Sequence, residues 1–206
     1  VISIPSFFNE KLAALLAKDF NVVLALNVFA HTNDPKSMLE AMAMVLREDG
    51  TIYIQTSQAN MFFNFEFDTV YHEHISFFNV SSMLALLKRT NLYLKSVSIV
   101  PIHGGSYLWE ITKKQTSGDE VFNRWKVEND NGIYRAESYK RLDFEVRKRV
   151  DEVKMIIEKY RKLGYVIASY GAAAKGNTFI NAAEIKLDFI FDDTPQKIGK
   201  YAPAGD

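Results

Sequence analysis

Residues 21–56 read NVVLALNVFAHTNDPKSMLEAMAMVLREDGTIYIQT, and this stretch decides the fold. The β-branched and aliphatic run Asn21–Leu26 predicts a buried strand. Asp34-Pro35 predicts a helix start, and apolar residues then recur at helical spacing until Gly50 ends the helix. The alternation over 51–56 predicts a second strand. A strand, a helix and a strand at this spacing predict a parallel pair joined by a crossover, which is an α/β arrangement.

Downstream patterns predict two further parts of the chain. The runs 92–100 and 106–112 predict an antiparallel hairpin at the edge of the sheet. The composition then becomes polar, and a long helical pattern covers about 134–163. We expect its apolar stripe over 146–160 to lie in a core. A strand, a small-residue loop, a helix and a strand follow between residues 165 and 191 and predict a second, smaller α/β unit. The predicted domains are therefore 1–113 and 114–206, the second beginning with a helical linker.

Composition limits the classes of function. The 206 residues carry 25 Lys+Arg against 25 Asp+Glu, so no basic surface is expected to attract nucleic acid or a membrane. The absence of Cys excludes disulfides and thiolate metal sites. No apolar run is long enough to cross a bilayer and no signal peptide is visible, so we expect a soluble, cytoplasmic protein. Because the chain begins with Val1 rather than Met, we expect a processed chain or a piece of a longer protein.

The densest group of chemically active side chains is the sequence Tyr71-His72-Glu73-His74. Four groups able to move protons, set among aromatic residues after a strand, are typical of a general acid–base site. Two alternatives stay open at this point. In an extended segment His72 and His74 share a face, which would also suit a His-x-His metal site, although spacing places no third ligand. The group could also be structural.

Three other sites carry weaker signals. His31 lies just past the carboxyl end of the first strand, where open α/β sheets bind ligands, but a loop or capping histidine would look the same. His103 precedes two glycines in the hairpin turn, and turn geometry alone explains them. The segment 170–178, YGAAAKGNT, leads from a strand through small residues into a helix, which suits an anion with Lys175 as counter-charge or simply a tight turn.

Together these segments make the chain similar to the S-adenosylmethionine-dependent C-methyltransferases that act on nucleotide-linked keto-deoxysugars. The resemblance begins at Phe7-Phe8 and covers nearly the whole chain. Its most specific strings are Asp-Thr-x-Tyr-His-Glu-His at 68–74 and Gly-Ala-x-Ala-Lys-Gly-Asn-Thr at 171–178. Weaker parts of the match are NVFAH at 27–31, HGGS at 103–106 and DDTPQK at 192–197.

The resemblance implies the fold and the reaction. It implies part of a class I methyltransferase sheet, Rossmann-like and with an edge hairpin, followed by a long helix and a small Rossmann-like domain. His74 would remove the proton alpha to the sugar ketone, and the enolate would attack the methyl group of S-adenosylmethionine. Tyr71, Glu73 and His31 would position the sugar and the enolate.

The resemblance also assigns binding residues. The methyl donor would be held by Asn27, Val28 and Ala30, with most of its site absent from this chain. The nucleotide-diphosphate sugar would be bound by a set of polar and glycine positions, with Lys175 and the amides after Gly171 facing the diphosphate. That set is His72, His103, Gly171, Lys175, Asn177 and Thr178. No metal ligand is assigned, and the incomplete sheet edge would offer a surface for self-association.

The chain departs from the family pattern at several points. It has no Cys for the family's zinc-binding piece, no Gly-x-Gly loop after a first strand, and it ends inside the usual C-terminal domain. Gln55-Thr56-Ser57-Gln58 stands where Glu-Val-Pro-Tyr is common, and Ser76-Phe77-Phe78 stands where Ser-Tyr-Phe is expected. Two other functions therefore stay open: a non-catalytic nucleotide-sugar-binding module, and a His-x-His metal protein.

Overall fold

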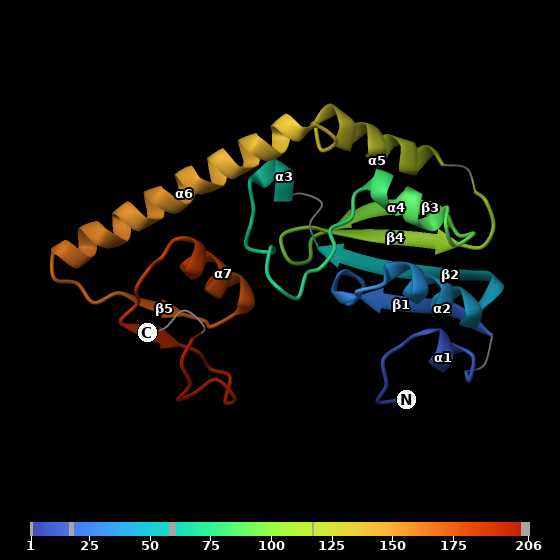
Figure 1. The fold of residues 1–206 in the computed structure, drawn as a ribbon, viewed down its shortest axis with the longest axis horizontal. Helices are drawn as coiled ribbons and strands as arrows, with labels where there is room; N and C mark the ends of the chain where they lie inside the picture. The colour runs from blue at the N-terminus through green and yellow to red at the C-terminus, as the bar shows by residue number, and fades with distance from the viewer. Residues whose placement is uncertain (1, 17–18, 58–60, 117, 203–206) are drawn as a thin grey trace. The chain divides into compact units, whose positions relative to one another are not determined.

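The computed structural model describes residues 2–16, 19–57, 61–116 and 118–202. Packing divides the chain into two units, which are described separately here (Figure 1). The first unit combines residues 1–60 with 73–134, and the second combines 61–72 with 135–206. The predicted boundary at 113–114 falls inside the first unit, just before a helix that packs against its sheet.

The first unit is a four-stranded sheet with helices, and its strand order is β1-β2-β4-β3. β1 and β2 are parallel, and β4 is antiparallel to both β2 and β3. The predicted parallel pair and the antiparallel edge hairpin are therefore confirmed. Its elements are α1 (Glu10–Ala13), β1 (Phe20–Leu26), the 3₁₀ turn η1 (Phe29–His31), α2 (Pro35–Val45), β2 (Leu46–Ser57), α4 (Val80–Leu87), β3 (Tyr93–Val100), β4 (Ser106–Thr112) and α5 (Asp119–Asp130).

The crossover helix begins as its sequence predicts and ends earlier. Asp34 caps α2, accepting a hydrogen bond from the backbone N–H of Ser37 at 3.0 Å, and Pro35 is the first helical residue. The helix stops at Val45, so the prediction that Gly50 ends it is wrong. Gly50 lies inside β2, where a Cβ atom would be 2.7 Å from the Leu46 side chain and 3.0 Å from the Asn21 carbonyl, so close packing favours glycine here.

The core of the first unit lies between one face of the sheet and its helices. Successive side chains of a strand point to opposite faces of the sheet, so every second strand residue points into this core. On β1 the opposite face leaves Val22, Leu24 and Leu26 exposed. The buried side chains that form the core include Ala25, Ile52, Ile54, Val97, Trp109 and Ile111 from the strands, and Leu39, Met42, Met83, Leu87 and Val121 from the helices.

The second unit contains a small parallel pair of strands and one long helix. Its elements are α3 (Met61–Asn64), α6 (Ala136–Lys162), β5 (Ala168–Tyr170), α7 (Ala174–Ala182) and β6 (Phe189–Phe191). β5 and β6 are parallel and joined through α7, so this part is the predicted α/β unit, with shorter strands. The predicted core stripe over 146–160 is buried only at Val150; Val146, Val153 and Ile157 are half-buried and Tyr160 is exposed.

None of the helices in the part of the chain that the structure describes is long and apolar enough to span a membrane.

Candidate active site

Two of the predicted catalytic histidines meet in the first unit. The rings of His31 and His74 have centroids 4.9 Å apart and planes at 89°, an edge-to-face arrangement. The main chain fixes this pair, because the N–H groups of Ile75 and Ser76 both donate to the carbonyl of Ala30, at 3.0 and 3.2 Å. His74 also packs edge-to-face on Phe77, with centroids 6.1 Å apart. The imidazole of His74 is therefore oriented by the loop after β1.

That loop lies at the carboxyl ends of the two parallel strands, which is the edge where α/β sheets bind ligands. Asn27 adopts a left-handed conformation (φ 56°), which few non-glycine residues adopt, and its N–H donates to the carbonyl of Gln55 at 3.2 Å. Val28 is exposed, whereas Ala30 is buried and its carbonyl is occupied by the His74 segment. Of the three predicted donor-binding residues, Asn27 and Val28 thus face outward at this edge.

Gln55 is a residue of this edge that the sequence did not mark as functional. The residue is 4% exposed, and its Nε2 has no hydrogen-bond partner among the described residues. A buried amide donor without an acceptor costs about 1–3 kcal/mol, so such groups call for an explanation. In the sequence, this position stands out only because Gln55 replaces the Glu of the family's Glu-Val-Pro-Tyr. That difference does not predict that the side chain is buried.

The turn that carries His103 lies at the same edge of the sheet. Ser57, the last residue of β2, pairs with Ser106, the first residue of β4, so the β3–β4 turn adjoins the carboxyl end of β2. His103 is exposed there and has a φ of 55°, followed by Gly104 at 86°. The turn geometry accounts for the glycines, and it presents the imidazole to solvent.

The remaining members of the acid–base cluster divide between the units. Glu73 belongs to the first unit with His74 and is exposed. Tyr71 and His72 belong to the second unit, where their ring centroids lie 6.3 Å apart. The roles predicted for these three residues stay predictions.

In the second unit, Asp192 organises the loop predicted to bind a diphosphate. Its carboxylate, at the end of β6, accepts hydrogen bonds from the N–H of Ala172 at 2.6 Å and of Thr194 at 2.9 Å, and it pairs with Lys197 at 3.0 Å. The hydrogen bond from the Thr194 side chain, followed by those from the Ala172 and Thr194 backbone N–H groups and from Lys197, holds the pKa of Asp192 well below its ordinary value. Gly171, with φ 96°, supplies the turn that brings the loop against β6, and its N–H donates to the Phe191 carbonyl.

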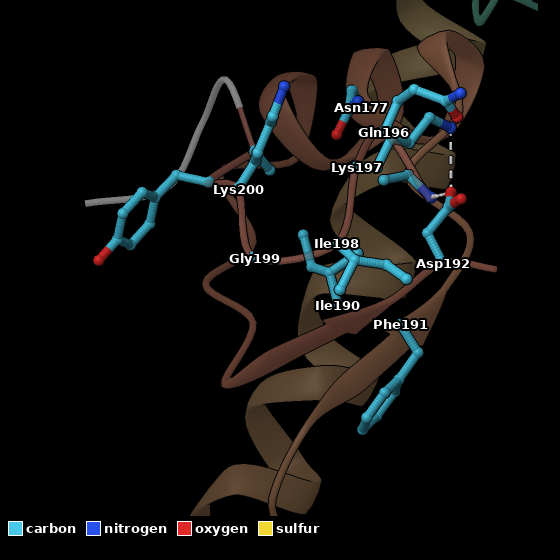
Figure 2. A pocket seen from close by; sticks show the side chains of 12 residues that line it. Asn177, Ile190, Phe191, Asp192, Gln196, Lys197, Ile198, Gly199 and Lys200 are labelled. Carbon is cyan, nitrogen blue, oxygen red and sulfur yellow. Dashed lines mark hydrogen bonds and ion pairs between the residues drawn. The ribbon is translucent and has the colours of Figure 1, made fainter. Parts of the chain in front are cut away.

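The other predicted residues of this loop differ in what they contact. Lys175 lies 3.6 Å from the carboxylate of Asp68, within the same unit. The hydroxyl of Thr178 donates to the carbonyl of Ala174 inside α7, at 3.0 Å. Asn177 lines a cavity of about 570 Å³ at the carboxyl ends of β5 and β6 (Figure 2). The same cavity is lined by Gln196 and Lys197, which belong to the matching string at 192–197, and by Lys200, which no sequence pattern singled out.

The described ranges contain no group of three or more His, Asp or Glu side chains arranged to hold a metal ion. The pair His31 and His74 can instead accept a proton and keep a fixed ring orientation, which suits acid–base chemistry.

Both halves of the chain match known methyltransferase families. Residues 101–206 match the family described as "C-methyltransferase C-terminal domain", and residues 4–97 match a "methyltransferase domain" family. The chain belongs to the C-methyltransferase family. The curated protein "C-methyltransferase NovU" from Streptomyces niveus is 24% identical over 215 residues, an alignment that covers 98% of this chain and 51% of NovU.

The chain therefore spans about half the length of this curated relative. The C-terminal-domain match covers β4 and α5 of the first unit together with residues 135–206 of the second unit, so the family boundary and the boundary between the units differ. The non-catalytic binding module and the metal protein are the less favoured alternatives, because both halves match methyltransferase families.

Proposed function

We propose that the protein transfers a methyl group from S-adenosylmethionine to the carbon alpha to the ketone of a nucleotide-linked deoxysugar. The observation that carries the proposal is the fixed His31–His74 pair at the carboxyl edge of the sheet, in a chain of the C-methyltransferase family. NovU, which is named a C-methyltransferase, supports the reaction class. The cytoplasmic location and self-association through the exposed edge of β1 stay predictions.

The residues at this edge fit the methyl donor. Asn27 and Val28 face outward after β1, and Gln55 beside them offers a buried amide donor without an acceptor. These residues would hold polar atoms of the donor, which supplies an electrophilic methyl group on a sulfonium. The donor carries carboxylate and hydroxyl oxygens, either of which can accept a hydrogen bond from the Gln55 amide.

His74 carries the proposed proton transfer. A neutral imidazole takes the proton from the carbon alpha to the ketone, the C–H electrons form the enolate, and His74 becomes an imidazolium. The enolate carbon then forms the new bond to the methyl group while the methyl–sulfur bond breaks. His31 fixes the plane of the base through its edge-to-face contact.

Methyl transfer itself tests the proposal. The full-length gene product that carries residues 1–206 is incubated with S-adenosylmethionine and nucleotide-linked 4-ketosugars and 3-ketosugars, and the sugar nucleotides are followed by mass spectrometry. We expect a product that is heavier by one methyl group and absent when the donor is omitted. Tight binding of a ketosugar nucleotide without any methylated product would contradict the proposal and favour the binding module.

A further inference from the structure

Residues 61–72 belong to the second unit, although the chain before and after them belongs to the first. They contain α3, which lies against α6 (Figure 1). They also contain the first residues of the string 68–74, which carries the proposed base. The contacts that hold this segment in the second unit therefore bear on how the string is placed.

Two helices of the second unit hold the segment by its aromatic side chains. The guanidinium of Arg149, on α6, lies 4.8 Å from the centroid of the Phe65 ring and donates a hydrogen bond to the Asn64 carbonyl. The ring of Phe67 packs on the ring of Phe179, on α7, with centroids 5.9 Å apart. The segment is therefore fixed to both α6 and α7.

An ion pair joins the two most specific strings of the sequence. The Nζ atom of Lys175, from the string 171–178, lies 3.6 Å from a carboxylate oxygen of Asp68, from the string 68–74. Lys175 is the second residue of α7 (Ala174–Ala182), whose first turn carries no acidic residue. A cation in the first turn opposes the helix dipole, so this placement is unfavourable unless an anion lies nearby. Asp68 supplies that anion.

A turn follows the ion pair and leads toward the proposed base. The N–H of Val70 donates to the carbonyl of Phe67 at 2.8 Å, and Thr69, inside this turn, is 2% exposed. His74 comes four residues after Val70. The two N–H groups that follow His74 are bonded to the Ala30 carbonyl. The main chain is thus held both before and after the base.

We propose that Asp68 and Lys175 are positioning residues for proton transfer by His74. Their ion pair fixes the start of the string, and the main chain of the string carries that constraint to the base. The inference rests on the proposed function and adds two residues that act through the base. In this role Lys175 affects the rate of proton transfer, whereas a contact with the diphosphate, as the resemblance implies, would affect the affinity for the nucleotide.

Solvent deuterium exchange at the carbon alpha to the ketone tests this role in the full-length gene product, with a nucleotide-linked ketosugar and no methyl donor. We expect Asp68→Asn and Lys175→Met each to slow the exchange about tenfold. The ketosugar concentration that gives half the maximal rate should change less than about twofold. The double variant should be no slower than either single variant, because both lose the same interaction. The reversed pair, Asp68→Lys with Lys175→Asp, should recover most of the wild-type rate.

Lys154→Met is the matched control. Lys154 has the same side-chain exposure as Lys175, 35%, and pairs with Glu184 at 3.1 Å in the second unit. We expect this variant to exchange at the wild-type rate. Melting temperatures are measured in parallel, and the loss of either ion pair should change them little, because these side chains are partly exposed.

Three results would overturn the positioning role. The first is exchange at the wild-type rate in the Asp68→Asn variant. The second is a raised half-saturating ketosugar concentration with an unchanged maximal rate in the Lys175→Met variant, which would indicate a diphosphate contact. The third is equal slowing in the Lys154→Met variant, which would indicate a general effect of losing an ion pair in this unit.

Backbone amide hydrogen exchange of the 206-residue chain, followed by mass spectrometry, measures the placement of the string independently of the reaction. We expect amides within 66–72 to exchange about two- to fivefold faster in Asp68→Asn and Lys175→Met than in the wild type or Lys154→Met. Unchanged amide exchange would contradict the role of the ion pair. Absence of both deuterium exchange and methyl transfer in the wild-type gene product would contradict the proposed function instead.

Discussion

Gln55 shows how a single buried side chain can indicate a ligand. Its backbone carbonyl accepts a hydrogen bond from the Asn27 N–H. Its side-chain Nε2, in contrast, has no acceptor in the described part of the protein. The neighbouring Thr56 is the opposite case, since its hydroxyl accepts a hydrogen bond from the Trp109 indole at 2.9 Å. Two adjacent buried polar residues of β2 thus differ in whether the fold satisfies them.

We expect Gln55→Met to raise the free energy of unfolding by up to about 1 kcal/mol, because the variant removes an unsatisfied donor and keeps the side-chain shape. Thr56→Val is the control, and we expect it to lower the free energy of unfolding by about 1–3 kcal/mol by leaving the Trp109 N–H without its partner. Urea denaturation of both variants measures the two changes. A loss of stability in the Gln55→Met variant would show that this amide has a structural partner.

At the scale of elements, a buried carboxylate ties α5 to α4 and β4. Glu128 is fully buried, and it accepts hydrogen bonds from the Val80 N–H at 2.9 Å, from the Tyr107 hydroxyl at 2.6 Å and from the Tyr134 hydroxyl. Burial, followed by the hydrogen bond to Glu128, raises the pKa of Tyr134 to about 12. The pKa of Tyr107 is raised for the same two reasons.

These shifts predict a loss of stability at alkaline pH. The folded pKa of Tyr134 lies above its unfolded value of about 10, so its contribution is complete below about pH 10 and is lost as the pH rises toward about 12. We expect Tyr134→Phe to be less stable than the wild type at neutral pH, with a difference that shrinks above about pH 10. Thermal denaturation of both proteins between neutral pH and about pH 12 measures this difference in stability. A difference that stays constant with pH would contradict the role assigned to the Tyr134 hydroxyl.

The same elements show what the sequence could predict. The strands of the crossover and the hairpin follow from aliphatic runs and alternation, and the start of α2 follows from Asp34-Pro35. The end of α2 does not follow, because it is set by pairing of Leu46 with Phe20 across the sheet, which is a tertiary contact. The pattern also does not predict α5, whose polar sequence is stabilised through buried contacts of Val121 and Glu128.

The candidate site was predicted in part for similar reasons. Motif strings identified His31 and His74, and the structure brings their rings together. The cavity residues Lys197 and Lys200 lie in a polar loop without periodicity, so no sequence pattern distinguishes the cation held by Asp192 from Lys200. The fold alone determines that the Asp192 carboxylate lies within reach of Lys197.

At the scale of the whole molecule, the chain contains two α/β units that repeat one principle. In each unit a parallel pair of strands ends at a loop with chemically active residues: His31 and Asn27 after β1, and Gly171 and Asp192 after β5 and β6. We propose that proton transfer takes place at the first edge and that the second unit binds the nucleotide. It follows that a variant of the base should change the rate of the chemical step and leave nucleotide affinity nearly unchanged.

Solvent deuterium exchange at the carbon alpha to the ketone tests this claim most directly. It is followed by nuclear magnetic resonance in the full-length gene product, with a nucleotide-linked ketosugar present and the methyl donor omitted. We expect His74→Asn to slow exchange by roughly 10²–10⁴-fold, with nucleotide affinity unchanged, and His72→Asn to exchange at the wild-type rate. Exchange at the wild-type rate in the His74→Asn variant, together with its loss in the His72→Asn variant, would contradict the account.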